Sequence, residues 1–329
     1  MPADDVSLTS KVRAVEAGGH VVAIHFVGES AAIATGEGEV LVAGGNEALI
    51  KAHQGVILAA AGDGSRIFTA GDDGKLVATD IDGKQEVLAA CGGKWIDQVA
   101  LGPSGTIAWS SGKTAFVRTN KGERSLEVSS TVGGLAFAPK GLRLAIAHYN
   151  GATLWFPNAD AKPETLTWKG SHLGVLFSPD GRFLITTMQE PALHGWRLSD
   201  GQHMRMSGYP ARVRSFGFSA DGDWLATSGA QEVILWPFRT RDGPMGKEPL
   251  MLAPGPEDAR VSAVAGHPQQ AVLAVGYSDG MVILARLEDA AEVLVSRPGG
   301  APVTALAWRG DGRQLAFGTE AGKAGLLAL

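Results

Sequence analysis

The chain has 329 residues and a formal charge of −5, from 29 lysines and arginines against 34 aspartates and glutamates. This length allows one large domain or two small ones, and a hydrophobic fraction of 45 % is enough for a sizeable core. The mildly acidic balance argues against a broad nucleic-acid-binding surface. The single cysteine, Cys91, excludes an internal disulfide framework and any cysteine-cluster metal site.

The N-terminal residues carry neither the basic nor the apolar stretch of a signal peptide. No apolar run approaches the length of about 18 residues that a membrane-spanning helix needs. We therefore expect a cytoplasmic protein that does not enter a membrane. Residues 1–10 are predicted to form a flexible N-terminal tail, and residues 11–329 a single domain.

Glycine is the compositional outlier, because its 45 residues are about twice the share found in an average protein. So many glycines indicate short elements joined by tight turns. The apolar runs between these turns are short and rich in Val, Ile, Leu, Phe and Trp, which is typical of strands. No stretch keeps a helical period of 3.6 residues with caps, so the sequence predicts an all-β chain with almost no helix.

In chain order, the first predicted element is a strand at residues 11–17, and after it one unit repeats along the chain. Each copy consists of a short strand, a polar turn, a second strand, a further glycine turn and a third strand. The turns of the eight copies lie near Glu29 and at Gly64, Gly105, Gly141, Gly181, Gly222, Gln270 and Gly312. Eight copies in 329 residues give about 41 residues each, the size of one four-stranded blade of a β-propeller.

Several short motifs recur at fixed places in these copies. They are Ser178-Pro-Asp-Gly-Arg and its relatives, Gly19-His20 before a strand, the turns Asp73-Gly74 and Asp279-Gly280, and Trp155, Trp196 and Trp236, which follow their turn glycines by 14 or 15 residues. In these motifs the chain resembles the WD40-repeat family from about residue 11 to its end. The copies are degenerate, since no Trp-Asp dipeptide is present, and His53 with Asp73 is the best partial match to the polar network of the family. The Ala- and Gly-rich, Lys-poor composition is typical of a bacterial protein.

The ends of the chain predict how the fold closes. The last copy ends at Leu329 with its third strand, and the strand at residues 11–17 belongs to no copy. Because an unpaired outer edge invites aggregation, residues 11–17 are expected to pair as the fourth strand of the last blade. We therefore predict a single all-β propeller of eight four-stranded blades, closed by this N-terminal strand. Seven blades remain the alternative if one weak copy is irregular.

A catalytic or metal site at the central channel of a propeller needs clustered Asp, Asn or His on the innermost strands. These strands have almost none here, with His25 and Asp97 as exceptions, and the eight histidines show no HxH or HExxH spacing. We therefore predict that the protein is not an enzyme and has no cofactor and no metal. The alternative is a ligand- or metal-binding sensor, or a propeller enzyme, with its site at that channel.

The remaining hypothesis is a monomeric scaffold that binds one or more proteins, but neither nucleic acid nor membrane. In a propeller, the turns between second and third strands share one face, the top, with the links between blades. All three tyrosines map to this face, and aromatic residues and arginine are enriched where partners bind. The predicted partner-binding residues are Trp95, Tyr149, Tyr209, Arg212, Arg260 and Tyr277. Alternatively, the tyrosine rings pack between neighbouring blades.

Overall fold

A computed structural model of the chain describes residues 7–45 and 47–329. Nearly all regular structure within them is β-strand, as predicted, and the helices there are two 3₁₀ turns, η1 (Thr9–Lys11) and η2 (Pro103–Gly105). Residues 1–6 of the predicted tail lie outside the described residues. The remainder of that tail makes contacts, because the Leu8 N–H donates to the Leu294 carbonyl at 2.7 Å.

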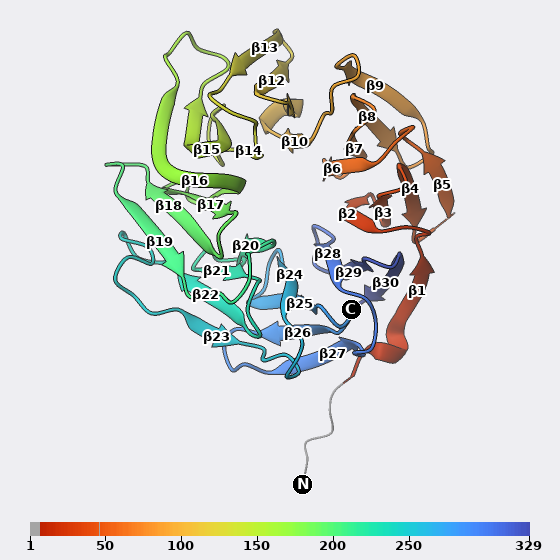
Figure 1. The fold of residues 1–329 in the computed structure, drawn as a ribbon. Helices are drawn as coiled ribbons and strands as arrows, with labels where there is room; N and C mark the ends of the chain where they lie inside the picture. Colours follow the sequence, from red (N-terminus) through yellow and green to blue (C-terminus); the bar gives the residue numbers. More distant parts are fainter. Residues whose placement is uncertain (1–6, 46) are drawn as a thin grey trace. The chain divides into compact units, whose positions relative to one another are not determined.

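The described residues divide into two compact units, and each is described by itself. The first unit contains the chain up to Ile50 together with Val213–Leu329, and its strands form four sheets of four strands (Figure 1). Three of these sheets follow the chain order: β2 (Val21–Val27), β3 (Ser30–Thr35), β4 (Glu39–Ala43) and β5 (Ala48–Lys51); β20 (Phe216–Phe218), β21 (Trp224–Thr227), β22 (Val233–Pro237) and β23 (Leu250–Leu252); and β24 (Val261–Gly266), β25 (Val272–Tyr277), β26 (Val282–Arg286) and β27 (Glu292–Ser296). The fourth contains β28 (Val303–Trp308), β29 (Gln314–Thr319), β30 (Lys323–Ala328) and, beside β30, the N-terminal β1 (Val12–Glu16).

The second unit, Lys51–Arg212, contains two four-stranded sheets and one six-stranded sheet. The four-stranded sheets are β6 (Ile57–Gly62), β7 (Arg66–Gly71), β8 (Lys75–Asp80) and β9 (Gln85–Ala90), and β10 (Gln98–Leu101), β11 (Ile107–Ser111), β12 (Thr114–Thr119) and β13 (Gly122–Glu127). The six-stranded sheet contains β14 (Gly134–Phe137), β15 (Leu144–Trp155), β16 (Glu164–Phe177), β17 (Phe183–Met188), β18 (Ala192–Arg197) and β19 (His203–Ser207).

The prediction of eight four-stranded blades is wrong, because the described strands form seven sheets, six of four strands and one of six. The difference arises where the copies with turns at Gly141 and Gly181 meet. There β15 and β16 are 12 and 14 residues long, and both continue through points where the repeat predicts a turn or a link. Two predicted copies therefore lie in one sheet, and the seven-bladed alternative matches the number of sheets.

Two irregular points bend these long strands. The pairing of β15 with β16 shifts register between Tyr149 and Gly151, where Asn150 has a φ of 67° and Gly151 a φ of 143°. The pairing of β16 with β17 shifts between His172 and Val175. Such bulges bend a strand and increase its twist without ending it. They let one sheet continue across the boundary that the repeat pattern indicates.

The N-terminal strand closes the last sheet, as predicted. It pairs antiparallel with β30, from Val12 opposite Leu327 to Glu16 opposite Lys323. The Val15 side chain is 6 % exposed and belongs to an apolar cluster that also takes in β2, β3 and β4. This strand therefore covers both the hydrogen-bonding edge of β30 and an apolar surface of the first unit.

This burial can be tested at two neighbouring positions of β1. Val15→Asp is expected to lower the free energy of unfolding by about 3 kcal/mol or more, because it places a carboxylate in the apolar cluster. Ala14→Asp is the control, since Ala14 points to the other face of the strand and is exposed; it should change stability by less than about 1 kcal/mol. Denaturant unfolding measures both, and equal effects at the two positions would contradict the closure.

The close approach of β15 and β16 at Gly151 gives a second prediction. A Cβ built on Gly151 lies 2.0 Å from the Leu166 carbonyl oxygen, so Gly151→Ala must push the two strands apart. We expect a loss of about 3 kcal/mol or more in the free energy of unfolding. Gly201→Ala is the matched control, because Gly201 also has a positive φ, 71°, but has open space around its Cβ. Backbone strain alone should cost about 1–2 kcal/mol there, and thermal or denaturant unfolding separates the two effects.

Candidate functional site

Each sheet places its second-to-third turn beside a link between sheets. In the second unit, the N–H of Cys91 in the β9–β10 link donates to the carbonyl of Gly74 in the β7–β8 turn at 2.8 Å. Likewise, the guanidinium of Arg212 in the link after β19 donates to Gln189 Oε1 beyond the end of β17 at 2.9 Å. We call this end of each sheet the turn end. It corresponds, sheet by sheet, to the top face of the sequence analysis.

Two of the predicted partner-binding residues are large aromatic side chains exposed at the turn end of the second unit. Trp95, in the β9–β10 link, is 61 % exposed, and Tyr149, at the bend of β15, is 57 % exposed. Arg212 is half-buried at the same end of its sheet. Arg260 belongs to the first unit and is exposed there, just before β24.

The other two predicted residues are part of the core. Tyr209 is 6 % exposed, and Tyr277, at the end of β25, is completely buried. The Tyr277 hydroxyl donates to the Ala253 carbonyl at 2.6 Å, and burial raises the pKa of this phenol. These two rings are packed inside the protein, as the alternative prediction has it, and neither presents a surface to a partner.

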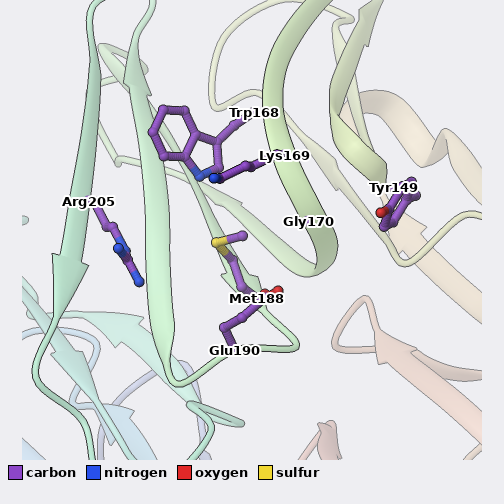
Figure 2. A pocket seen from close by; sticks show the side chains of 7 residues that line it. All are labelled: Tyr149, Trp168, Lys169, Gly170, Met188, Glu190 and Arg205. Atoms are coloured by element: carbon purple, nitrogen blue, oxygen red, sulfur yellow. The ribbon is translucent and has the colours of Figure 1, made fainter.

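A pocket of about 280 Å³ opens beside Tyr149 at the bend of the six-stranded sheet (Figure 2). Its lining consists of Tyr149, Trp168, Lys169, Gly170, Met188, Glu190 and Arg205. The absence of a side chain at Gly170 keeps the pocket open: a Cβ there would lie 2.8 Å from Met188 Cε and 3.3 Å from Glu190 Oε2. The Gly170 N–H donates to Asn150 Oδ1 at 3.2 Å, which ties the two bent strands together at this point.

The Trp168 ring in this pocket rests on two imidazoles. It is stacked on His194 with a centroid distance of 4.1 Å and an interplanar angle of 14°, and it contacts His203 at 4.6 Å. His194 in turn meets the edge of Trp196 at 4.7 Å. The backbone of Trp168 is held as well, since its carbonyl accepts a hydrogen bond from His172 Nε2 at 3.0 Å.

His194 is completely buried, and neither of its ring nitrogens has a hydrogen-bond partner among the described residues. Burial is the main cause that lowers the pKa of His194 to about 3, and the nearby His172, His203 and Arg205 lower it further. The ring is therefore neutral at physiological pH. It serves Trp168 as a flat apolar support.

The described residues contain no group of three or more His, Cys, Asp or Glu side chains arranged to hold a metal ion. Asp97, one of the polar exceptions on the inner strands, accepts a hydrogen bond from Ser110 Oγ at 2.7 Å, and burial raises the pKa of its carboxyl group. The other exception, His25, is half-buried in β2. Among the same residues, no helix is long and apolar enough to cross a membrane.

The sequence analysis missed the pocket and its aromatic support. Trp168 and Lys169 lie in β16 at a point where the repeat pattern predicts a link, so their neighbours could not be inferred. The one available signal was the spacing of two between His194 and Trp196, which places both side chains on the same face of β18. That spacing gives no hint of the stacking with Trp168.

The buried imidazole predicts a pH dependence of stability. In the unfolded chain His194 takes up its proton near pH 6.5, whereas in the folded protein it does so only near pH 3. The stabilisation that comes from keeping His194 neutral is therefore complete above pH 6.5 and is lost progressively as the pH falls toward 3. At pH 4.5 the free energy of unfolding should be lower by about 2–3 kcal/mol.

Denaturant unfolding at pH 7.5 and pH 4.5 measures this effect. His194→Phe should lose less stability than the native protein over this interval, by about 2 kcal/mol. The control is His20→Phe, which removes an exposed histidine. It should leave the difference in the free energy of unfolding between pH 7.5 and pH 4.5 unchanged. Parallel pH profiles for the native protein and His194→Phe would contradict the assignment.

Comparison with known proteins concerns the fold rather than the pocket. Residues 268–329, which run from before β25 to the end of the chain, match the model of the anaphase-promoting complex subunit 4 WD40 domain. No curated protein sequence matches the chain. A crystal structure of the computationally designed Ika8 protein is similar with a TM-score of 0.75 at 17 % identity, over 95 % of this chain and 98 % of the designed one.

The family match covers less than half of the chain, but it falls on the sheets that carry the predicted repeat motifs near Gly280 and Gly312. The structural similarity extends over nearly the whole chain and, at this identity, shows the fold alone. Since the antiparallel sheets, the N-terminal strand that completes the last of them and both matches agree, the chain has the fold of a WD40-type β-propeller.

Proposed function

We propose that this protein is a non-enzymatic scaffold that binds one or more proteins at the turn ends of its sheets. The exposure of Trp95 and Tyr149 carries the proposal, because 61 % and 57 % of these large side chains remain in contact with water. Aromatic residues are usually buried when stability alone decides their place, and they are enriched among residues that dominate binding energy. Arg212, at the turn end of its sheet in the second unit, and Arg260, just before β24 in the first unit, are proposed as polar contacts, each within its own unit.

The proposal assigns no chemistry to the buried titratable groups of the second unit, since these groups have structural contacts. His194 supports Trp168, His172 bonds to the Trp168 carbonyl, and Asp97 accepts the Ser110 hydroxyl. A rigid set of sheets with preformed turns provides shape for a partner without any such chemistry. We further propose that the protein acts as a cytoplasmic monomer.

Co-purification with the tagged full chain from cells that naturally express it tests this function. The double substitution Trp95→Ala and Tyr149→Ala is expected to reduce a stoichiometric co-purifying protein by about tenfold or more, because truncating binding aromatics typically costs over 1 kcal/mol each. The melting temperature should change by only a few degrees, since both side chains are mostly exposed.

The matched control is Ile81→Ala with Phe156→Ala. These side chains are 42 % and 41 % exposed in the second unit, but they lie at the ends of β8 and β15 away from the turn end. The control should retain the partner. Loss of the partner in both double variants, or in neither, would contradict a binding surface at Trp95 and Tyr149.

A further inference from the structure

We propose that the pocket in Figure 2 binds an acidic side chain of a partner protein, an Asp or Glu that stands next to an apolar or aromatic residue in the partner's docking segment. This inference rests on the proposed scaffold function and names the chemistry that one of its sites recognises. Three observations carry it: the charges at the pocket, its aromatic wall and its size.

Charge is the first observation. Lys169 and Arg205 line the pocket, both are exposed, and neither forms an ion pair within the part of the chain that the structure describes. Several other arginines of the second unit form ion pairs, as Arg124 does with Asp160. The lining includes one carboxylate, Glu190, so the pocket carries a net positive charge in a protein whose formal charge is −5. Complementary charge of this kind favours an anionic group on the partner.

The apolar wall is the second observation. Figure 2 shows Trp168 and Met188 between Arg205 on one side and Tyr149 on the other. Because Trp168 is stacked on the buried His194 and its backbone is held by His172, its ring is positioned before any partner binds. A ring that is already fixed loses little conformational entropy on binding. It therefore suits an apolar side chain adjacent to the acidic one.

Size and position are the third observation. Small-molecule sites usually have volumes of about 300–1,000 Å³, whereas this pocket has about 280 Å³. A pocket at the lower end of this range is large enough for one or two side chains of a protein. Tyr149 belongs both to the pocket lining and to the exposed aromatic residues of the proposed binding surface, so the pocket is continuous with that surface.

Selection from a displayed random peptide library against the full-length protein tests the inference. Selected peptides are expected to share an Asp or Glu next to an apolar or aromatic residue. A selected peptide is then synthesised with a fluorescent label, together with a version in which the acid is replaced by its amide, and fluorescence polarisation measures the affinity of both. The amide version should bind about tenfold more weakly, since charge-assisted contacts are lost.

The decisive variant is Lys169→Glu with Arg205→Glu. This double variant should bind the acidic peptide at least about tenfold more weakly, because its glutamates repel the peptide's carboxylate. The control, Lys140→Glu with Lys162→Glu, makes the same change of charge at two exposed lysines of the second unit outside the pocket lining. This control should stay within about twofold of the native affinity, because neither lysine lines the pocket and salt screens exposed charges that do not contact the ligand.

Several results would overturn the inference: peptides without acidic residues, no selected peptide at all, or equal loss of affinity in both double variants. Peptides that depend on Trp95 but not on the pocket residues would overturn it while leaving the scaffold function in place. Failure of the scaffold function is a separate result, because it would be seen as unchanged co-purification in the Trp95→Ala and Tyr149→Ala variant.

Discussion

Contact between the first strands of successive sheets is the constraint on which the first unit depends. Three hydroxyls, two of them in first strands and the third on Ser215 just before β20, each donate to a carbonyl in the first strand of the following sheet. The Ser262 hydroxyl donates to the Val303 carbonyl at 2.7 Å and the Thr304 hydroxyl to the Val21 carbonyl at 2.6 Å, and Ser215 makes the equivalent bond to the Val264 carbonyl at 3.3 Å. These bonds satisfy backbone groups that the strand ladders leave open and fix the spacing between sheets.

The same contacts require small residues in the second strands. A Cβ on Gly276 would lie 2.5 Å from Val303, and a Cβ on Gly318 would lie 2.5 Å from Val21. Glycine therefore lets each valine fill the space beside the neighbouring strand, and the valine is then fully excluded from water. Part of the high glycine content, which the sequence analysis attributed to turns, serves this packing between sheets.

Sequence analysis predicted the turns and the polar contacts near them well, because both depend on local chemistry. Gly181 has the positive φ that its Asp-Gly turn requires, and the His53–Asp73 pair is present at 2.9 Å, with Thr69 on the other ring nitrogen. The number of sheets could not be predicted in this way. It depends on whether β15 and β16 stay hydrogen-bonded through a bulge at Gly151, which only the three-dimensional pairing decides.

The candidate site shows the same division between local and tertiary information. Strand parity placed Tyr277 correctly at the end of β25 and Tyr149 at the point where β15 bends, but the exposure of the two side chains depends on distant neighbours. Tyr277 is buried because Gly255, in the preceding link, leaves room for its ring: a Cβ on Gly255 would lie 2.7 Å from Tyr277 Cε1. Tyr149 has no such cover and stays exposed. Sequence alone treats the two tyrosines as equivalent.

His194 lowers the stability of its sheet but positions the tryptophan of the pocket. Each buried ring nitrogen without a partner costs about 1–3 kcal/mol, whereas stacking of two rings contributes only about 0.5–1.5 kcal/mol. By this comparison an apolar side chain at position 194 would stabilise β18 more than the imidazole does. What an aliphatic residue would remove is the flat surface that holds Trp168 at an angle of 14°. The residue present therefore favours the position of the pocket's tryptophan over the stability of the sheet, which is the expected pattern where a binding site is built into a folded core.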